Sequence, residues 1–292
     1  MTIPYRLLAV DVDGTLMDSR NQLPDPNREA LHRAHQAGLY VCICTGRSLT
    51  ETREVLDQLG LDLDAGVFVF GAVVSDLKIC RTLCRSPIAP PLAERVVAFF
   101  REHDYPVLCL YDADQAGFDY LLIRGRRNAN ACERWLAMTP TRVHRADQWA
   151  PGPNEPLRFS VIEERDRAGP LMAELSAVFP DREIKFNPIY APNYGFHVVE
   201  CFAPEVNKWH GLGHLMTRWA ITPDQVVAVG DDINDLEMIS RAGLGIAMGN
   251  AVPRVRQAAA WHAPSHDQGG LSVAIESLLA GRINTSRPVR DT

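Results

Sequence analysis

Two aspartates that follow directly on an apolar run are the residues in this sequence best suited to chemistry. Residues 5–10 are nearly all apolar, and Asp11, Asp13 and Gly14 come next. Side chains alternate along a strand, so the two acids share a face for as long as the extended geometry continues. A solvated turn at a strand end would also account for Asp and Gly here. The alternative is a divalent cation site in which one carboxylate attacks an electrophile.

Further polar residues follow predicted strands or begin predicted helices. They are Thr45-Gly46-Arg47, Lys208, and the group Asp231, Asp232, Asn234 and Asp235. The carboxyl ends of parallel strands share one edge of a sheet, so these residues can meet although they are distant in sequence. Carboxylate oxygens suit Mg²⁺, and phosphoryl transfer requires mainly positioning and neutralised charge. The set therefore predicts magnesium-assisted phosphoryl transfer, with Asp232 as a turn residue.

The elements that must position these residues alternate in a regular way. Strands at 5–10, 39–44 and 66–70, with helices at 25–37 and about 50–59, predict an α/β fold with a doubly wound parallel sheet. The alternation resumes after Pro204, with a helix at 208–219, strands at 225–229 and 244–248 and a helix between them. We predict a discontinuous core domain of residues 1–85 and 201–280.

The intervening segment, 86–200, has a different pattern. Helices are predicted near 91–103, 131–138 and 169–179, and strands near 107–111, 120–123, 157–163, 183–186 and 195–201. Helices and paired strands do not alternate there as in a simple parallel winding, so we predict an inserted α+β domain. The polar residues 281–292 are predicted to be a disordered tail.

The composition is that of an ordinary soluble globular protein. The chain has 292 residues, 46% of them hydrophobic and 23% charged, with a net charge of −6. The acidic balance argues against a nucleic-acid partner, and no apolar run is long enough for a membrane span. No signal peptide is recognisable, the seven cysteines lack zinc-site spacing, and we expect a cytoplasmic protein with reduced thiols. No obligate protein partner is evident.

The motifs Asp11-x-Asp13-Gly14-Thr15, Thr45-Gly46-Arg47, Lys208 and Gly230-Asp231-x-x-Asn234-Asp235 resemble those of the haloacid dehalogenase (HAD) superfamily. Their order and the large insert between the second and third motifs are similar to the Cof-type subgroup. The resemblance implies a HAD-like Rossmannoid core with an inserted α+β cap of class IIB (C2B type). It covers about residues 5–280.

This resemblance implies a role for each matching residue. Asp11 would be the nucleophile that forms an aspartyl phosphate, and Asp13 the general acid and base. Thr45 and Lys208 would hold the phosphoryl oxygens, with Gly46, Arg47 and Asn234 also on the phosphate side. Mg²⁺ would be bound by Asp11, the backbone carbonyl of Asp13 and Asp231, with Asp235 supporting them.

The resulting prediction is a Mg²⁺-dependent phosphatase that acts on a small phosphorylated metabolite such as a sugar phosphate. Two alternatives stay open: a phosphomutase of the phosphomannomutase type, and a non-catalytic sensor of a phosphorylated ligand. One departure from the subgroup is Phe70, where Asn-Gly-Ala is usual; it is either core filler or an apolar face toward substrate. In the insert, Arg158, Tyr190, Tyr194 and His197 are candidates for substrate selection or for purely structural roles.

Overall fold

A computed structural model describes residues 4–138, 140–191 and 195–283. Its contacts divide the chain into two compact units, which are described separately. The first unit takes in the described residues of 1–47, 52–80 and 207–292, and the second takes in those of 48–51 and 81–206. The predicted inserted segment, 86–200, belongs to the second unit. Of the predicted tail, 284–292 lie outside the described residues, whereas Gly281 and Arg282 donate backbone hydrogen bonds to Leu278 and Ser277.

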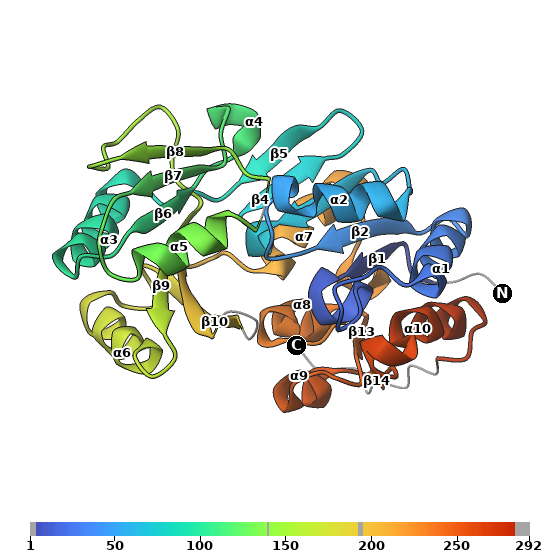
Figure 1. The fold of residues 1–292 in the computed structure, drawn as a ribbon. Coiled ribbons are helices and arrows are strands. Elements are labelled where there is room, and N and C mark those ends of the chain that lie inside the picture. The colour runs from blue at the N-terminus through green and yellow to red at the C-terminus, as the bar shows by residue number, and fades with distance from the viewer. Residues whose placement is uncertain (1–3, 139, 192–194, 284–292) are drawn as a thin grey trace. The chain divides into compact units, whose positions relative to one another are not determined.

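The first unit is built on a largely parallel sheet, which confirms the predicted α/β class (Figure 1). Within this unit the strand order is β14-β13-β12-β1-β2-β3-β4, and only β4 runs antiparallel to its neighbour. The strands are β1 Leu7–Val10, β2 Tyr40–Cys44, β3 Ala65–Phe68, β4 Val73–Asp76, β12 Val226–Gly230, β13 Leu244–Ala247 and β14 Trp261–His262. Strand β1 pairs with both β2 and β12, so the residue after Val10 emerges at the middle of the sheet edge.

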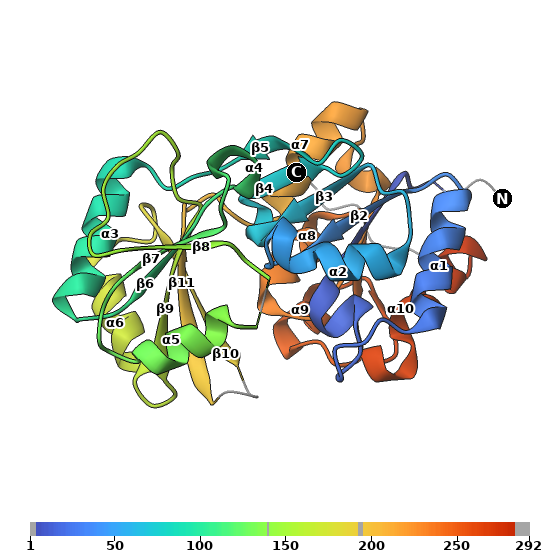
Figure 2. The ribbon, with the colours of Figure 1, turned by 45° about the horizontal axis from the view of Figure 1, so that its top comes forward.

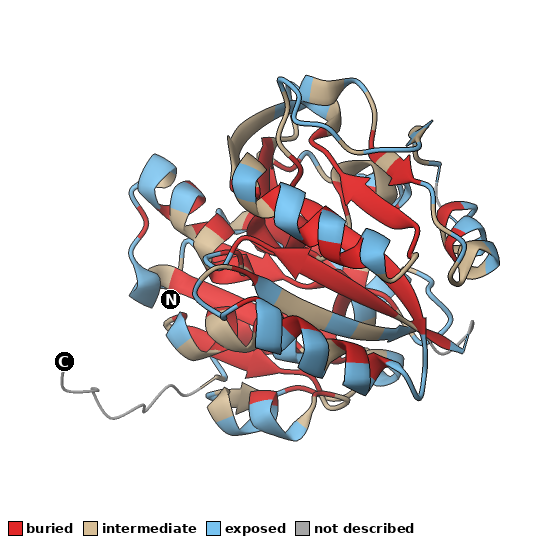
Figure 3. Cartoon of the chain, turned by 90° about the vertical axis from the view of Figure 1, so that its left-hand side faces the viewer, coloured by how far each residue is buried: buried red, intermediate tan, exposed pale blue. Residues whose placement is uncertain are grey.

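Helices cover both faces of this sheet. One face packs against α1 (Asp25–Gln36), α2 (Leu49–Leu59, whose first turn is counted with the second unit) and α10 (Gly270–Leu279). The other packs against α7 (Lys208–Trp219) and α8 (Leu236–Arg241), and α9 (Pro253–Ala258) contacts α8 and β13. In α1 the buried residues Ala30, Leu31 and Ala34 recur at helical spacing, the pattern of an amphipathic helix on a core. The helices in the foreground of Figure 3 likewise have buried residues on one side and exposed residues on the other.

The third predicted strand, 66–70, ends earlier than expected. It stops at Phe68 because Val69 and Phe70 both have positive φ, 51° and 54°, and Gly71 follows with 103°. Non-glycine residues rarely adopt this region of the backbone map, and a β-branched residue does so least readily. The amides of Val69 and Phe70 donate instead to Arg47 and Thr45. The strained turn is thus attached to the loop after β2.

The second unit contains a mixed sheet with the order β10-β11-β9-β6-β7-β8. All neighbours are antiparallel except β7 and β8. Its strands are β6 Val107–Leu110, β7 Tyr120–Ile123, β8 Val143–Ala146, β9 Arg158–Glu164, β10 Lys185–Ala191 and β11 Phe196–Phe202, and β5 (Arg81–Arg85) precedes them in the chain. This antiparallel arrangement agrees with the predicted α+β pattern of 86–200.

Two helices of this unit, α3 (Pro90–Glu102) and α6 (Ala168–Val178), lie on one side of the sheet, and α5 (Ala129–Leu136) lies on the other (Figure 2). The first side is closed by edge-to-face aromatic contacts of Phe179 with Phe99 and Phe186. The short α4 (Ala113–Ala116) is capped by Asp112. Across the described residues, no helix combines the length and the apolar character that crossing a bilayer requires.

Candidate active site

Asp11 lies at the carboxyl edge of the central strand of the first unit. Its amide donates to Val229 of the neighbouring strand, 3.1 Å away, and the residue is only 5% exposed. All four residues of β1 are buried, so the strand fixes the position of this carboxylate through its packing on both faces. The chain then leaves the strand in a tight turn, Val12–Leu16, in which Gly14 has φ 79°.

Lys208 brings a cation to the same place. It is the first residue of α7, whose N-cap Asn207 accepts a hydrogen bond from the amide of His210 at 2.9 Å. Its ammonium group donates to Asp11 Oδ1 and, at 2.6 Å, to Asp235 Oδ1. The lysine side chain is 1% exposed, and a buried ammonium requires such partners. Burial lowers the pKa of Lys208, but the adjacent Asp11 and Asp235 outweigh it, so the net shift is upward and the group stays charged.

Asp231 and Asp235 come from the loop after β12. The side chain of Asp235 folds back so that Oδ2 accepts the amides of Asp231 and Asp232, at 2.9 and 3.1 Å. Gly230 allows this return, because a Cβ atom there would lie 2.4 Å from the carboxyl carbon of Asp235. Asp232 accepts from the amide of Ile233, as expected for a turn residue.

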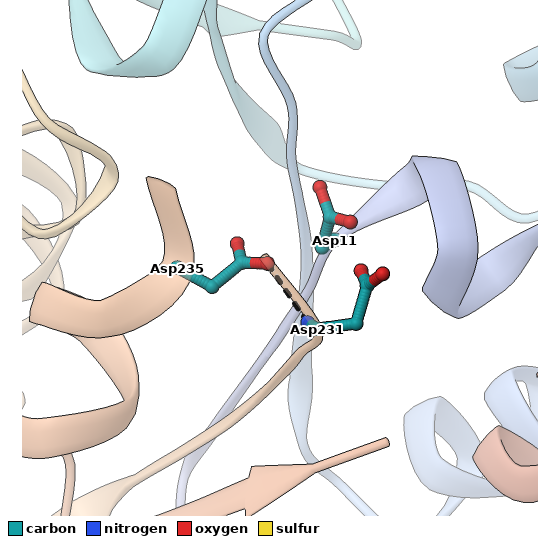
Figure 4. A group of neighbouring side chains, drawn as sticks. All are labelled: Asp11, Asp231 and Asp235. Atoms are coloured by element: carbon teal, nitrogen blue, oxygen red, sulfur yellow. Dashed lines mark hydrogen bonds between the residues drawn. The ribbon is translucent and has the colours of Figure 1, made fainter. Parts of the chain in front are cut away.

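Asp11, Asp231 and Asp235 form an acidic cluster in which one oxygen from each lies within 4.8 Å of the others. Their carboxylates point toward a common region, and the Asp231 amide bonds to Asp235 at its side (Figure 4). Burial, then repulsion from Asp235, raises the pKa of Asp11 well above its usual value. The same two causes raise the pKa of Asp231 to about 7. Three carboxylates beside one lysine therefore leave uncompensated negative charge.

The residues of this cluster fit a hard divalent cation. Carboxylate oxygens are the donors that Mg²⁺ selects, and the cation would relieve the repulsion that raises the two pKa values. Asn234 supplies a further oxygen: its Oδ1 is buried and has no hydrogen-bond partner among the described residues. A buried oxygen without a hydrogen-bond donor destabilises the folded protein, unless a cation-bound water or a ligand donates a hydrogen bond to it.

Asp13 lies outside the acidic cluster. Its side chain is 57% exposed and forms a two-point ion pair with Arg47, in which Nε donates to Oδ2 at 3.0 Å and Nη2 bonds Oδ1. The same Nη2 donates to Asn21 Oδ1 at 3.0 Å. The strand geometry that would place both acids on one face ends at Val10. Arg47, placed on the phosphate side by resemblance, here holds Asp13.

Thr45 and Gly46 form the loop between β2 and α2. Thr45 is fully buried, its amide donates to Val67, and its hydroxyl oxygen accepts the amide of Arg47 at 3.1 Å. Gly46 is covered by the ring of Phe70, since a Cβ atom there would lie 2.3 Å from that ring. Phe70 is 8% exposed, so its ring mainly fills space over this loop. The phosphate roles of Thr45, Gly46 and Arg47 stay predictions.

Two residues of the site were not foreseen. Thr15 donates from its hydroxyl to Asp231 Oδ1 at 3.1 Å, and Asn250 donates to Asp231 Oδ2 at 3.0 Å. Thr15 belongs to the first motif but carries no obvious chemistry. Asn250 follows β13, and a polar residue just beyond a parallel strand is the signal that could have identified it.

The selection candidates of the second unit have structural partners. Arg158 is buried, pairs with Glu200 at 2.8 Å and donates to the hydroxyl of Tyr120 at 2.6 Å. Burial raises the pKa of Glu200 to about 7 although Arg158 opposes it. Tyr190 lies against His197 and Arg165, and Tyr194 lies outside the described residues. The buried ion pair favours a structural role for Arg158, whereas the roles of Tyr190 and His197 in substrate selection stay predictions.

The chain is similar to several known proteins. A family model described as haloacid dehalogenase-like hydrolase matches residues 8–275. The 5-amino-6-(5-phospho-D-ribitylamino)uracil phosphatase YcsE of Bacillus subtilis is 28% identical over 94% of this chain and 95% of its own length. The HMP-PP phosphatase of Cronobacter sakazakii is 26% identical over 86% of this chain and 86% of its own length. The solved HAD subclass IIB sugar phosphatase BT4131 superposes with a TM-score of 0.72 and 20% identity, over 93% of this chain and 98% of that one.

Proposed function

Because the chain belongs to the haloacid dehalogenase-like hydrolase family, we propose that it is a Mg²⁺-dependent phosphatase that hydrolyses a small phosphomonoester through Asp11. The observation that carries the proposal is the position of this carboxylate. It is buried at the edge of the central strand, and Lys208 bonds only one of its oxygens among the described contacts. The other oxygen, Oδ2, is left to act as the nucleophile.

In the first step, Asp11 Oδ2 forms a bond to phosphorus as the bond from phosphorus to the leaving oxygen breaks. Lys208 stabilises the transferring phosphoryl group by its charge and holds Asp11 in place. Asp11, Asp231 and the backbone carbonyl of Asp13 would hold Mg²⁺, with Asp235 supporting them, and the cation would supply positive charge opposite the phosphoryl oxygens. The leaving alkoxide takes a proton from Asp13.

In the second step, a water attacks the aspartyl phosphate and Asp13 accepts its proton, which restores Asp11 and releases phosphate. Asp13 is suited to both transfers because it lies on the exposed side of the site, outside the acidic cluster.

The proposed substrate class is supported by the two relatives named above. One is named as a phosphatase of a phosphoribitylamino-uracil and the other of HMP-PP, both small phosphorylated metabolites. We propose a substrate of the same class for this chain, with the second unit as the cap that selects it. No nucleic-acid, membrane or obligate protein partner is proposed.

The test is release of inorganic phosphate from p-nitrophenyl phosphate and from a panel of phosphorylated metabolites, with and without Mg²⁺. We expect Mg²⁺-dependent turnover by the wild type and none by Asp11→Asn. Formation of a sugar-phosphate isomer without phosphate release would show a mutase. Tight ligand binding with no turnover across metals and pH would show a sensor, and either result would refute the proposal.

A further inference from the structure

Asn250 joins three loops at the acidic cluster. It follows β13 and is half-buried. Its side-chain amide donates to the carbonyl of Gly14 at 2.9 Å and to Asp231 Oδ2 at 3.0 Å. Its Oδ1 accepts the backbone amide of His266 at 3.0 Å. One side chain thus connects the turn after Asp11, the loop after β12 and the segment before α10.

The orientation of this amide is fixed by its partners. A backbone N–H can only donate, so the atom that faces His266 must be the oxygen of Asn250. The nitrogen then faces two acceptors, a carbonyl and a carboxylate, and each takes one of its two hydrogens. Exchanging the two atoms would lose all three hydrogen bonds.

Asp231 is consequently held at both of its oxygens. Thr15 donates to Oδ1 and Asn250 to Oδ2, while Gly14 lies so close that a Cβ atom there would be 2.4 Å from Oδ2. A carboxylate on a single bond would otherwise rotate freely, and repulsion from Asp235 and Asp11 would turn it away from the cluster. Donors on both oxygens oppose that rotation and favour the charged form.

We propose that Asn250 is a positioning residue that holds Asp231 in the orientation required for the divalent cation. The inference rests on the proposed function, since it presupposes the cation. Residues that orient a metal ligand commonly alter metal affinity about 10- to 100-fold when they are removed. Asn250 also fixes the spacing between the two loops that carry Asp11 and Asp231, because it bonds to one residue of each.

The chain contains a matched control. Asn27 is fully buried, donates to the carbonyl of Leu16 at 2.9 Å and accepts the amide of Ser272 at 3.1 Å. It therefore also joins the N-terminal turn to the C-terminal part of the first unit, but both of these contacts are with backbone atoms rather than with a carboxylate. A purely structural role for Asn250 predicts the same behaviour for both residues.

The experiment measures Mn²⁺ binding by electron paramagnetic resonance and Mg²⁺ binding by calorimetry, with circular dichroism as the folding control. We expect Asn250→Ala and Asn250→Ser to weaken binding of both ions about 10-fold or more. Asn27→Ala should lower the unfolding temperature while binding the ions within about twofold of the wild type. Asn250→Ser keeps a small polar side chain, so it provides a folded variant if the alanine variant is unstable.

Unchanged affinity in folded Asn250 variants would overturn the inference and leave the proposed function intact. Equal loss of affinity in Asn27→Ala would also overturn it, since the effect would then belong to general packing. If the wild type bound neither ion, the metal site of the proposed function would be refuted, and the inference about Asn250 would be refuted with it. The three outcomes are distinguishable in one series of titrations.

Discussion

Lys208 and Asp11 form an ion pair inside the first unit, with their side chains 1% and 7% exposed. Removal of one partner from such a buried pair leaves an uncompensated charge and costs about 3–5 kcal/mol. In this chain, removal of Lys208 would leave two carboxylates without their cation, because Lys208 also pairs with Asp235. The lysine that is proposed to bind phosphoryl oxygens is therefore also expected to stabilise the fold.

Lys208→Met should lower the free energy of unfolding by about 3–5 kcal/mol and abolish turnover. Urea denaturation at pH 7 measures the first effect and a phosphate-release assay the second. Lys78 is the matched control: it pairs with Asp64 at 2.6 Å but is 49% exposed, so Lys78→Met should cost less than about 1 kcal/mol. Equal losses in the two variants would contradict the buried pair.

The raised pKa of Asp231, about 7, predicts a pH dependence of stability and of metal binding. In the metal-free protein this carboxyl keeps its proton up to about pH 7, whereas in the unfolded chain it loses the proton near its ordinary pKa of 3.8. The contribution of this carboxyl to the free energy of unfolding is therefore fully present below pH 3.8 and is lost as the pH rises through about 7. Mg²⁺ requires the deprotonated form, so its stabilising effect should increase over the same upper range.

The measurement is the thermal unfolding temperature with and without Mg²⁺ between pH 5.5 and 8.5. The shift caused by Mg²⁺ should be small at the acid end and largest at the alkaline end. Asp231→Asn serves as the control and should flatten this dependence. A shift of constant size across the range would show that the carboxyl is ionised throughout.

The ring of Phe70 explains why residue 46 is glycine. The φ angle of Gly46 is not in the left-handed region, so the obstacle to a side chain there is the ring rather than the backbone. Gly46→Ala should destabilise the protein and reduce turnover, whereas the same change in a Phe70→Ala background should cost less. A double-mutant cycle by urea denaturation should give a coupling of about 0.5–3 kcal/mol, and strict additivity would exclude the contact.

The sequence indicated which segments form the core strands and helices, and at which of their ends polar residues follow. Asp11, Lys208 and Asp231 could be placed together because they follow or begin elements whose burial and periodicity are plain, and parallel strands share an edge. The class of the fold followed from the same alternation.

The sequence could not show how the chain turns after each strand. Asp13 points to Arg47 because the strand ends at Val10 and the turn Val12–Leu16 begins before the second acid. Phe70 covers Gly46 because Val69 and Phe70 take up left-handed conformations that their residue types disfavour. Asn250 carries only the general signal of a polar residue beyond a parallel strand, and its particular role depends on three partners that lie far from it in the sequence. Each of these features depends on tertiary contacts between loops, which local propensity does not encode.

Substitution of Asp13 should impair turnover but not metal binding, whereas substitution of Asp231 should impair metal binding. Asp13 has its carboxylate outside the acidic cluster and paired with Arg47, so Asp13→Asn should bind Mn²⁺ within about twofold of the wild type and yet lose turnover by about 10²-fold or more. Asp231→Asn should lose Mn²⁺ affinity about 10- to 100-fold. Electron paramagnetic resonance titration and phosphate release, measured on the same samples, test both statements. Loss of Mn²⁺ binding in Asp13→Asn would place its side chain among the metal ligands, and full turnover there would remove it from the chemistry.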